Sequence, residues 1–268
     1  MIPLRDNIPS RTTPVVNYWI MAVCCLVYLL QSGDTDGRLT LMFGMIPQRI
    51  SQPDKAVVIE HHEIVRTPFG IQEVKARTEV PLSPVPAWLT PFTCIFLHGS
   101  FMHLLGNMWF LYIFGDNVED RLGHRGYLIF YTGCGIGASL AHFVFAPGSP
   151  IPTIGASGAI AGVMGAYLLL YPHANVVSLV PIIFLLHLMT IPAPVFLGIW
   201  FVIQLLQGTF SIGATEATGV AWWAHIGGFV VGFAVAWILG RVGQTSPRVV
   251  VRRVGTDRGF RQIRYPWD

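Results

Sequence analysis

Four polar side chains in this sequence have the chemistry needed for acyl transfer, although they stand far apart along the chain. Ser157 lies among small residues, and its hydroxyl becomes a nucleophile only when a neighbouring group accepts its proton. His225 can act as that base. His103 and Asn107 have helical i, i+4 spacing and therefore project from one face of a helix. There they can donate hydrogen bonds to a developing oxyanion together with the backbone N–H of Ser157, near a helix N-terminus.

No carboxylate is available to complete a catalytic triad. From residue 126 to residue 240 the only acidic residue is Glu216, which belongs to a predicted turn. We therefore predict a Ser-His dyad in which packing and backbone contacts orient His225. His98 lies about 140° from His103 on a helical wheel, so we expect it to stay outside the site and to support the loop through a hydrogen bond.

Each of these residues also has a structural interpretation. In a membrane protein, a serine among glycines and alanines is more commonly a packing residue that lets helices approach closely. A single intramembrane histidine is more often a satisfied structural group, and Asn107 alone could hold two helices together. Three histidines could instead bind a metal ion. The sequence has no His-Glu-x-x-His motif, however, so a zinc site is disfavoured.

The composition is that of a protein that crosses a membrane several times. Hydrophobic residues make up 53% of the 268-residue chain and charged residues 12%, against roughly 25% charged in an ordinary soluble domain. The four cysteines have neither metal-type nor disulfide-type spacing, and we interpret them as small buried side chains. The N-terminus lacks the pattern of a cleavable signal peptide. We therefore expect the first apolar segment to remain as an anchor.

Apolar runs predict an all-α, polytopic bundle of six membrane-spanning helices between residues 15 and 240. A long outer loop occupies about residues 31–97, and within it the alternating segment Val57–Val80 suggests a hairpin or a stretch on the membrane surface. The apolar run from Val176 is too long for one span, so a short buried or interfacial segment should precede the fifth helix. The expected spans are about Val15–Leu30, Phe96–Gly115, Tyr127–Phe145, Ile154–Tyr171, Val195–Leu206 and Val220–Leu239.

The distribution of Lys and Arg predicts the orientation of these spans. The tails, residues 1–14 and 241–268, and the turn with Arg121 and Arg125 carry most of the uncompensated positive charge, which the positive-inside rule places in the cytoplasm. Ser157 and the starts of the second and sixth spans then lie toward the outer side. Topology and anionic lipids explain the basic C-terminal tail, so we predict a lipid bilayer and no nucleic acid as its partner.

Small residues predict which helices bring the dyad together. The fourth span has a stripe of small residues at every fourth position from Ser157, and the sixth span has one through Ala224, Gly228 and Gly232. Two such faces let helix backbones approach closely. We therefore expect Ser157 to share a hydrogen bond with His225.

Four linked motifs carry a family resemblance. They are Phe96-Leu97-His98-Gly99-Ser100-Phe101-Met102-His103-Leu104-Leu105-Gly106-Asn107, Asn117-Val118-Glu119-Asp120-Arg121-Leu122-Gly123, Gly155-Ala156-Ser157-Gly158 and Ala224-His225-Ile226-Gly227-Gly228. Because it has these motifs in this order, the chain resembles the rhomboid family of intramembrane serine proteases over about residues 88–239. The resemblance implies a six-helix bundle with a water-accessible cavity open to the outer side, and no metal or organic cofactor.

The resemblance also implies roles for individual residues. Ser157 matches the nucleophile, His225 the base, and His103 and Asn107 the oxyanion-hole side chains. We expect supporting roles for four further residues of these motifs, which are His98, Gly155, Gly158 and Gly228. Substrates of such a family are single-span membrane proteins, cut within or beside the transmembrane segment.

Two features depart from the family pattern. Ala161 stands where some members have an aromatic residue packed on the catalytic histidine, so His225 should have a different neighbour, and the long first loop has no Trp-Arg pair.

The leading hypothesis is an intramembrane serine endopeptidase in a bacterial inner membrane, with both termini cytoplasmic. The alternatives are a non-catalytic rhomboid-like protein that binds or escorts membrane helices, and a small transporter, for which we find no convincing internal repeat. The sequence specifies neither a substrate sequence nor an oligomeric state.

Overall fold

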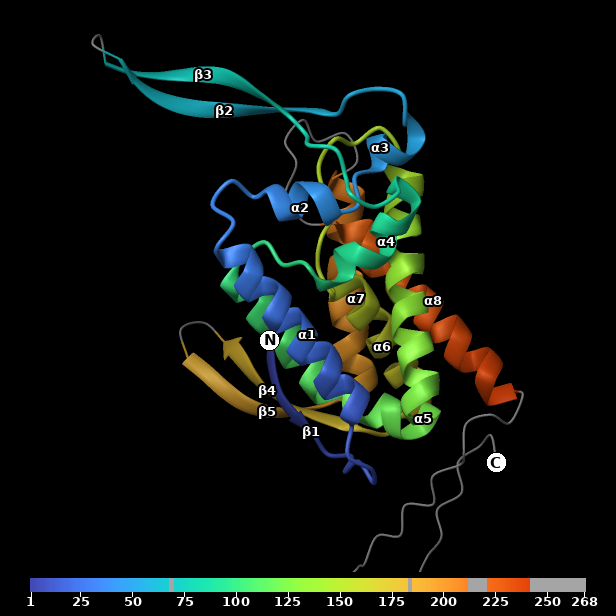
Figure 1. The fold of residues 1–268 in the computed structure, drawn as a ribbon. Helices are drawn as coiled ribbons and strands as arrows, with labels where there is room; N and C mark the ends of the chain where they lie inside the picture. The colour runs from blue at the N-terminus through green and yellow to red at the C-terminus, as the bar shows by residue number, and fades with distance from the viewer. Residues whose placement is uncertain (68–69, 183–184, 212–220, 242–268) are drawn as a thin grey trace, which may run out of the picture.

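The computed structural model describes residues 1–67, 70–182, 185–211 and 221–241. These residues are mostly helical (Figure 1). The helices are α1 (Val15–Ser32), α2 (Arg38–Phe43), α3 (Pro47–Ser51), α4 (Thr90–Thr93), α5 (Phe101–Phe145), α6 (Ser157–Leu170), α7 (Ala193–Ser211) and α8 (Trp222–Arg241). The strands are β1 (Ile2–Asp6), β2 (Val58–Thr67), β3 (Gly70–Glu79), β4 (Asn175–Ile182) and β5 (Leu185–Pro192), and two 3₁₀ turns, Ala87–Leu89 and Cys94–Phe96, flank α4.

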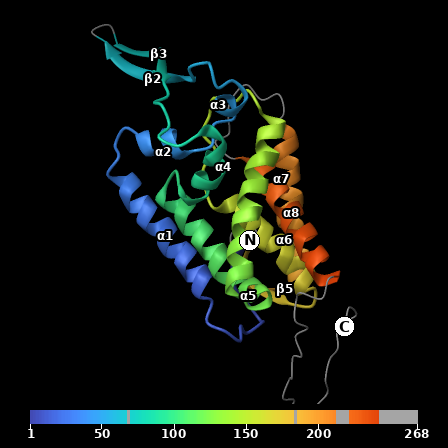
Figure 2. The same ribbon diagram turned by 45° about the vertical axis from the view of Figure 1, so that its right-hand side comes forward.

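Within the described residues, four helices are long and apolar enough to cross a membrane, namely α1, α5, α7 and α8. Of these, α5 has 45 residues, which at 1.5 Å per residue would span about 68 Å, far more than a bilayer core of about 30 Å. Gly123 interrupts it with φ 72° and ψ 161°. Figures 1 and 2 show the two halves of α5 side by side, meeting at one end of the molecule. The expected third span falls within this element, and so does the expected second span from Phe101 onward.

Helix α6 lies in the middle of the bundle, and every residue from Gly158 to Tyr167 is buried. It approaches α8 through glycine. A Cβ atom added at Gly228 would lie 2.0 Å from the carbonyl oxygen of Gly158, and one at Gly232 would lie 2.0 Å from that of Gly162. Larger side chains would hold the two backbones apart. The small-residue contact predicted between these two helices is thus confirmed.

The expectation of an all-α chain is wrong in one respect, because the described residues include two small antiparallel sheets. One has the strand order β1-β4-β5, and the other pairs β2 with β3. The segment from Val176, expected to be a short buried or interfacial stretch, forms the β4–β5 hairpin. Strand β5 is almost entirely exposed although it is apolar, and Pro192 at its end leads directly into α7.

The predicted outer loop contains α2, α3, the β2–β3 hairpin and α4. The hairpin alternative for Val57–Val80 is confirmed, with Val58 paired to Glu79 and Thr67 to Gly70. Ile46, Val57 and Val80 form a small apolar cluster at its base. These elements lie at one end of the bundle, and the β1-β4-β5 sheet lies at the opposite end (Figure 1). Of the predicted basic C-terminal tail, only Arg241 falls within the described residues.

Polar side chains of α5 hold the N-terminal segment at the bundle end that contains Gly123. The Glu119 carboxylate accepts hydrogen bonds from the backbone N–H groups of Val16 and Asn17, 2.9 and 2.7 Å away. A carboxylate at a helix N-terminus satisfies N–H groups that lack intrahelical acceptors. Glu119 is fully buried, so the cluster expected at the membrane interface also fixes the position of α1.

Candidate active site

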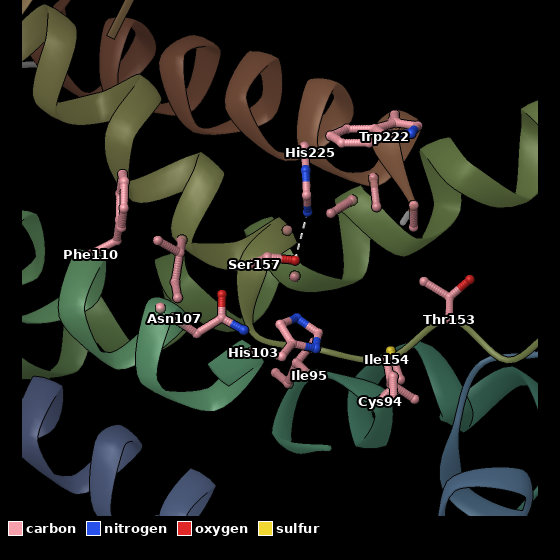
Figure 3. A pocket seen from close by; sticks show the side chains of 18 of the residues that line it. Cys94, Ile95, His103, Asn107, Phe110, Thr153, Ile154, Ser157, Trp222 and His225 are labelled. Carbon is pink, nitrogen blue, oxygen red and sulfur yellow. Dashed lines mark hydrogen bonds between the residues drawn. The ribbon is translucent and has the colours of Figure 1, made fainter. Parts of the chain in front are cut away.

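The Ser157 hydroxyl oxygen lies 2.7 Å from Nε2 of His225, which is hydrogen-bond distance (Figure 3). Ser157 is the first residue of α6, and His225 lies in the first turn of α8. The glycine contacts between these helices bring the two side chains together. The expected hydrogen bond between Ser157 and His225 is therefore present.

A cavity of about 650 Å³ surrounds the pair. Its walls are mainly apolar, and they include Met102, Phe110, Ile154 and Trp200. The polar groups that reach it are few, and they include the two side chains of the dyad. A mostly apolar cavity with a few convergent polar groups is typical of a binding or catalytic site.

His103 and Asn107 line the same cavity, one helical turn apart on α5. In Figure 3, Ser157 lies between His225 on one side and His103 and Asn107 on the other. Asn107 is 7% exposed, and its Nδ2 is a buried donor without a hydrogen-bond partner among the described residues. Ser100 begins the helix and accepts a hydrogen bond from the His103 backbone N–H, 3.1 Å away. This cap sets the start of α5, and with this start both side chains face the cavity.

The three predicted supporting glycines lie where a side chain would not fit. Gly155 has φ 122°, a conformation that L-residues rarely adopt. A Cβ atom there would lie 2.9 Å from Cε1 of His103. At Gly158 a Cβ atom would lie 2.6 Å from that of Ala138, and Gly228 meets the backbone of Gly158. These glycines let α5 and α8 close around the start of α6.

His98 lies beside the cavity wall and not on α5, which begins at Phe101. The helical-wheel comparison with His103 therefore does not apply, and the two rings are neighbours, with centroids 5.3 Å apart. His98 Nδ1 lies 3.3 Å from the carbonyl oxygen of Phe96, and its backbone N–H donates to the Gln31 side chain of α1. These contacts agree with the expected hydrogen bond in the loop.

The sequence analysis missed Gln204 of α7. Its Oε1 lies 2.7 Å from Nδ1 of His225, so the side chain that contacts the second ring nitrogen is an amide. The expectation that packing and backbone contacts orient the histidine did not include this side-chain contact. Gln204 did carry a signal, because it is the one amide in the predicted fifth span, and polar side chains inside a membrane commonly have a function.

Two tryptophans flank the imidazole ring. The ring centroids of Trp200, on α7, and Trp222, on α8, each lie 6.0 Å from that of His225. Ala161, on the position that is aromatic in some family members, is fully buried in α6. His225 was expected to have a neighbour other than an aromatic residue at position 161. Its neighbours are these two indole rings and the Gln204 amide.

Comparisons with known proteins agree on one family. Residues 86–242 match a family model described as "Rhomboid domain". The chain is 30% identical over 165 residues to "Rhomboid-like protein 11, chloroplastic" of Arabidopsis thaliana, which covers 60% of this chain and 56% of that protein. It is 36% identical over 153 residues to "Rhomboid protease GluP" of Bacillus subtilis (strain 168), covering 57% of this chain and 26% of that protein.

A third relative is the "Putative rhomboid protease YdcA" of the same bacterium, 37% identical over 88 residues, or 33% of this chain and 44% of that protein. The chain thus spans between about a quarter and little more than half of the length of these three relatives. Some relatives are named as proteases and others only as rhomboid-like.

Proposed function

The chain belongs to the rhomboid family, and from this premise we propose that it is an intramembrane serine endopeptidase acting through Ser157 and His225. The observation that carries the proposal is the 2.7 Å separation of Ser157 Oγ and His225 Nε2 inside an apolar cavity. His225 takes the hydroxyl proton as Ser157 attacks the scissile carbonyl carbon, and it then gives the proton to the departing amine. Water hydrolyses the resulting acyl-enzyme by the same route.

The oxyanion of the tetrahedral intermediate needs donors that are already in place. Asn107 Nδ2 and His103 are suited to this role, because both line the cavity on the side of Ser157 away from the base. The backbone N–H of Ser157 is the third donor. As the first residue of α6, Ser157 has no intrahelical acceptor for this N–H.

We further propose a six-span topology, in which the two halves of α5 and the short α6 each count as a span. Both termini then face the cytoplasm, and the loop that contains α2 to α4 faces the outer side of a bacterial cell membrane. The Lys and Arg distribution supports this orientation. The 14 residues of α6 cover about 21 Å, which is less than the roughly 30 Å of a bilayer core. Ser157, at the start of this short helix, should therefore lie below the outer surface of the membrane.

The proposed substrates are single-span membrane proteins, cleaved within or beside the transmembrane segment. A segment with small residues unwinds more easily, because glycine in particular weakens a helix. The cavity is large enough for several side chains of an unwound peptide.

The experiment uses the purified protein in detergent and in proteoliposomes, with a fluorescent fluorophosphonate and a single-span substrate. The wild type should react with the fluorophosphonate and cleave the substrate. The Ser157→Ala variant should lose both activities while it stays folded. The matched control is Ser139→Ala. Ser139 lines the same cavity, but its hydroxyl lies 3.4 Å from the Cys94 thiol instead of an imidazole, so this variant should still label.

Cleavage by Ser157→Ala at the wild-type rate would overturn the proposed mechanism. The wild type could instead be folded, fail to react with the fluorophosphonate or to cleave the substrate, and still cross-link to a single membrane helix. This result would favour a non-catalytic protein that binds or escorts membrane helices.

A further inference from the structure

The dyad functions in only one of the two neutral tautomers of His225. Nε2 faces Ser157 and must present a lone pair to accept the hydroxyl proton. The imidazole proton must therefore be on Nδ1. In a triad a carboxylate enforces this choice, but Glu216 is the only acid from residue 126 to residue 240, and it lies outside the described residues. The tautomer depends on the group that faces Nδ1.

The atom that faces Nδ1 is the amide oxygen of Gln204, at 2.7 Å. An amide oxygen accepts hydrogen bonds and cannot donate them. With the amide in this orientation, Nδ1 carries the proton and donates it to Oε1, and Nε2 is left with its lone pair directed at Ser157. Gln204 is 6% exposed, so water competes little for this contact.

The surroundings of Gln204 hold it in this position. One helical turn before it, Trp200 flanks the imidazole ring. One turn after it, Gly208 lies close to α8, because a Cβ atom added there would lie 3.1 Å from Cδ1 of Ile226. Both contacts lie on the face of α7 that carries Gln204.

We propose that Gln204 is a positioning residue, which keeps His225 in the tautomer and ring orientation that let it act as a base. The inference rests on the proposed serine protease function and adds a third member to the dyad. It assigns to a neutral amide the orienting role that a carboxylate has in a Ser-His-Asp triad. The amide costs less to bury in an apolar site than a charged group does.

Two substitutions separate hydrogen bonding from packing. Gln204→Met keeps the length and much of the volume of the side chain but has no strong acceptor. Gln204→Glu keeps an oxygen acceptor toward Nδ1. The matched control is Gln207→Met, on the same helix but exposed. The measurements are the rate of fluorophosphonate labelling, kcat and KM for a single-span substrate, and thermal unfolding.

We expect Gln204→Met to slow labelling and to lower kcat by roughly 10- to 100-fold, because a buried imidazole N–H loses its acceptor. KM should change by less than about threefold. Gln204→Glu should restore most of the rate, and Gln207→Met should match the wild type. A folded Gln204→Met variant with the wild-type rate would overturn the inference. Equal loss of rate in folded Met and Glu variants would also overturn it.

The test distinguishes this inference from the proposed function. A wild type without Ser157-dependent labelling would contradict the protease itself. An active wild type with an unimpaired Gln204→Met variant would contradict only the positioning role.

Discussion

Asn107 is buried, and its amide nitrogen donates to no acceptor among the described residues. A buried donor without a partner costs about 1–3 kcal/mol of stability. In the proposed reaction the oxyanion supplies the missing acceptor, so the interaction forms only as charge develops. This is the condition under which a donor accelerates the chemical step.

We predict that Asn107→Ala lowers kcat/KM by about 10² to 10³, less than Ser157→Ala does, and that it leaves thermal stability unchanged or slightly raised. Substrate cleavage and thermal unfolding in the same detergent check both parts. Leu105→Ala, an exposed position on the same helix, is the control. A large loss of stability in Asn107→Ala would indicate a helix-packing role for Asn107.

At the residue level, the sequence predicted that Ser157 and His225 share one site, because Ser157 lies in a stripe of small residues on its helix and His225 borders such a stripe on its own helix. It also predicted that His103 and Asn107 share a helix face. Gln204 escaped because its partner is 21 residues away on another helix, and no spacing rule connects the two. His98 was assessed on a helix that in fact begins after it.

The contact between α6 and α8 depends on glycines that meet backbone rather than side chains. At Gly232 an added Cβ atom would lie 2.0 Å from the Gly162 carbonyl oxygen. A backbone carbonyl in a helix cannot rotate away, so the helices themselves must separate. Ser157 and His225 are on these helices and would separate as well.

We predict that Gly232→Ala destabilises the protein by about 1–3 kcal/mol and slows fluorophosphonate labelling of Ser157. Gly240→Ala is the matched control, because Gly240 is on the same helix and an added Cβ atom would meet nothing within 4 Å. Thermal unfolding and labelling rates of both variants test the prediction. Equal behaviour of the two variants would mean that the close contact is not required.

Most helices were predictable from hydropathy, whereas the β1-β4-β5 sheet was not. The segment from Val176 is a continuous apolar run, which length and composition cannot distinguish from part of a helix. Its partner β1 belongs to a segment that carries charges and prolines and was expected to be a tail. The β2–β3 hairpin was predictable as one of two alternatives, because its residues alternate in polarity and its strands are neighbours in sequence.

The described residues form a helical bundle with the β1-β4-β5 sheet at one end, and the β2–β3 hairpin projects from the other end (Figures 1 and 2). Among the residues between Val58 and Glu79 whose side chains the structure describes, none belongs to the main core cluster. The hairpin is joined to the bundle through the small cluster of Ile46, Val57 and Val80 at its base. The dyad should therefore be independent of the rest of the hairpin.

We predict that replacing residues 60–77 with an Asn-Gly turn, which connects the paired Ile59 and Thr78, leaves Ser157 labelling within about threefold of the wild type. Two-residue Asn-Gly turns suit antiparallel strands. Labelling and cleavage are measured on the same preparation. Loss of labelling would contradict this independence, whereas normal labelling with slow cleavage of a membrane substrate would assign the hairpin to substrate recruitment.

The pairing of β1 with β4 also has a consequence for the order in which the protein is made. The Asn175 backbone N–H donates to the Asn7 side chain across 168 residues of sequence. At a synthesis rate of about 5 to 20 residues per second, β1 waits roughly 10 to 30 s for its partner strand. During that time α1 and both halves of α5 have already left the ribosome. Strand β1 can therefore pair with β4 only after α1, α5 and α6 have been synthesised.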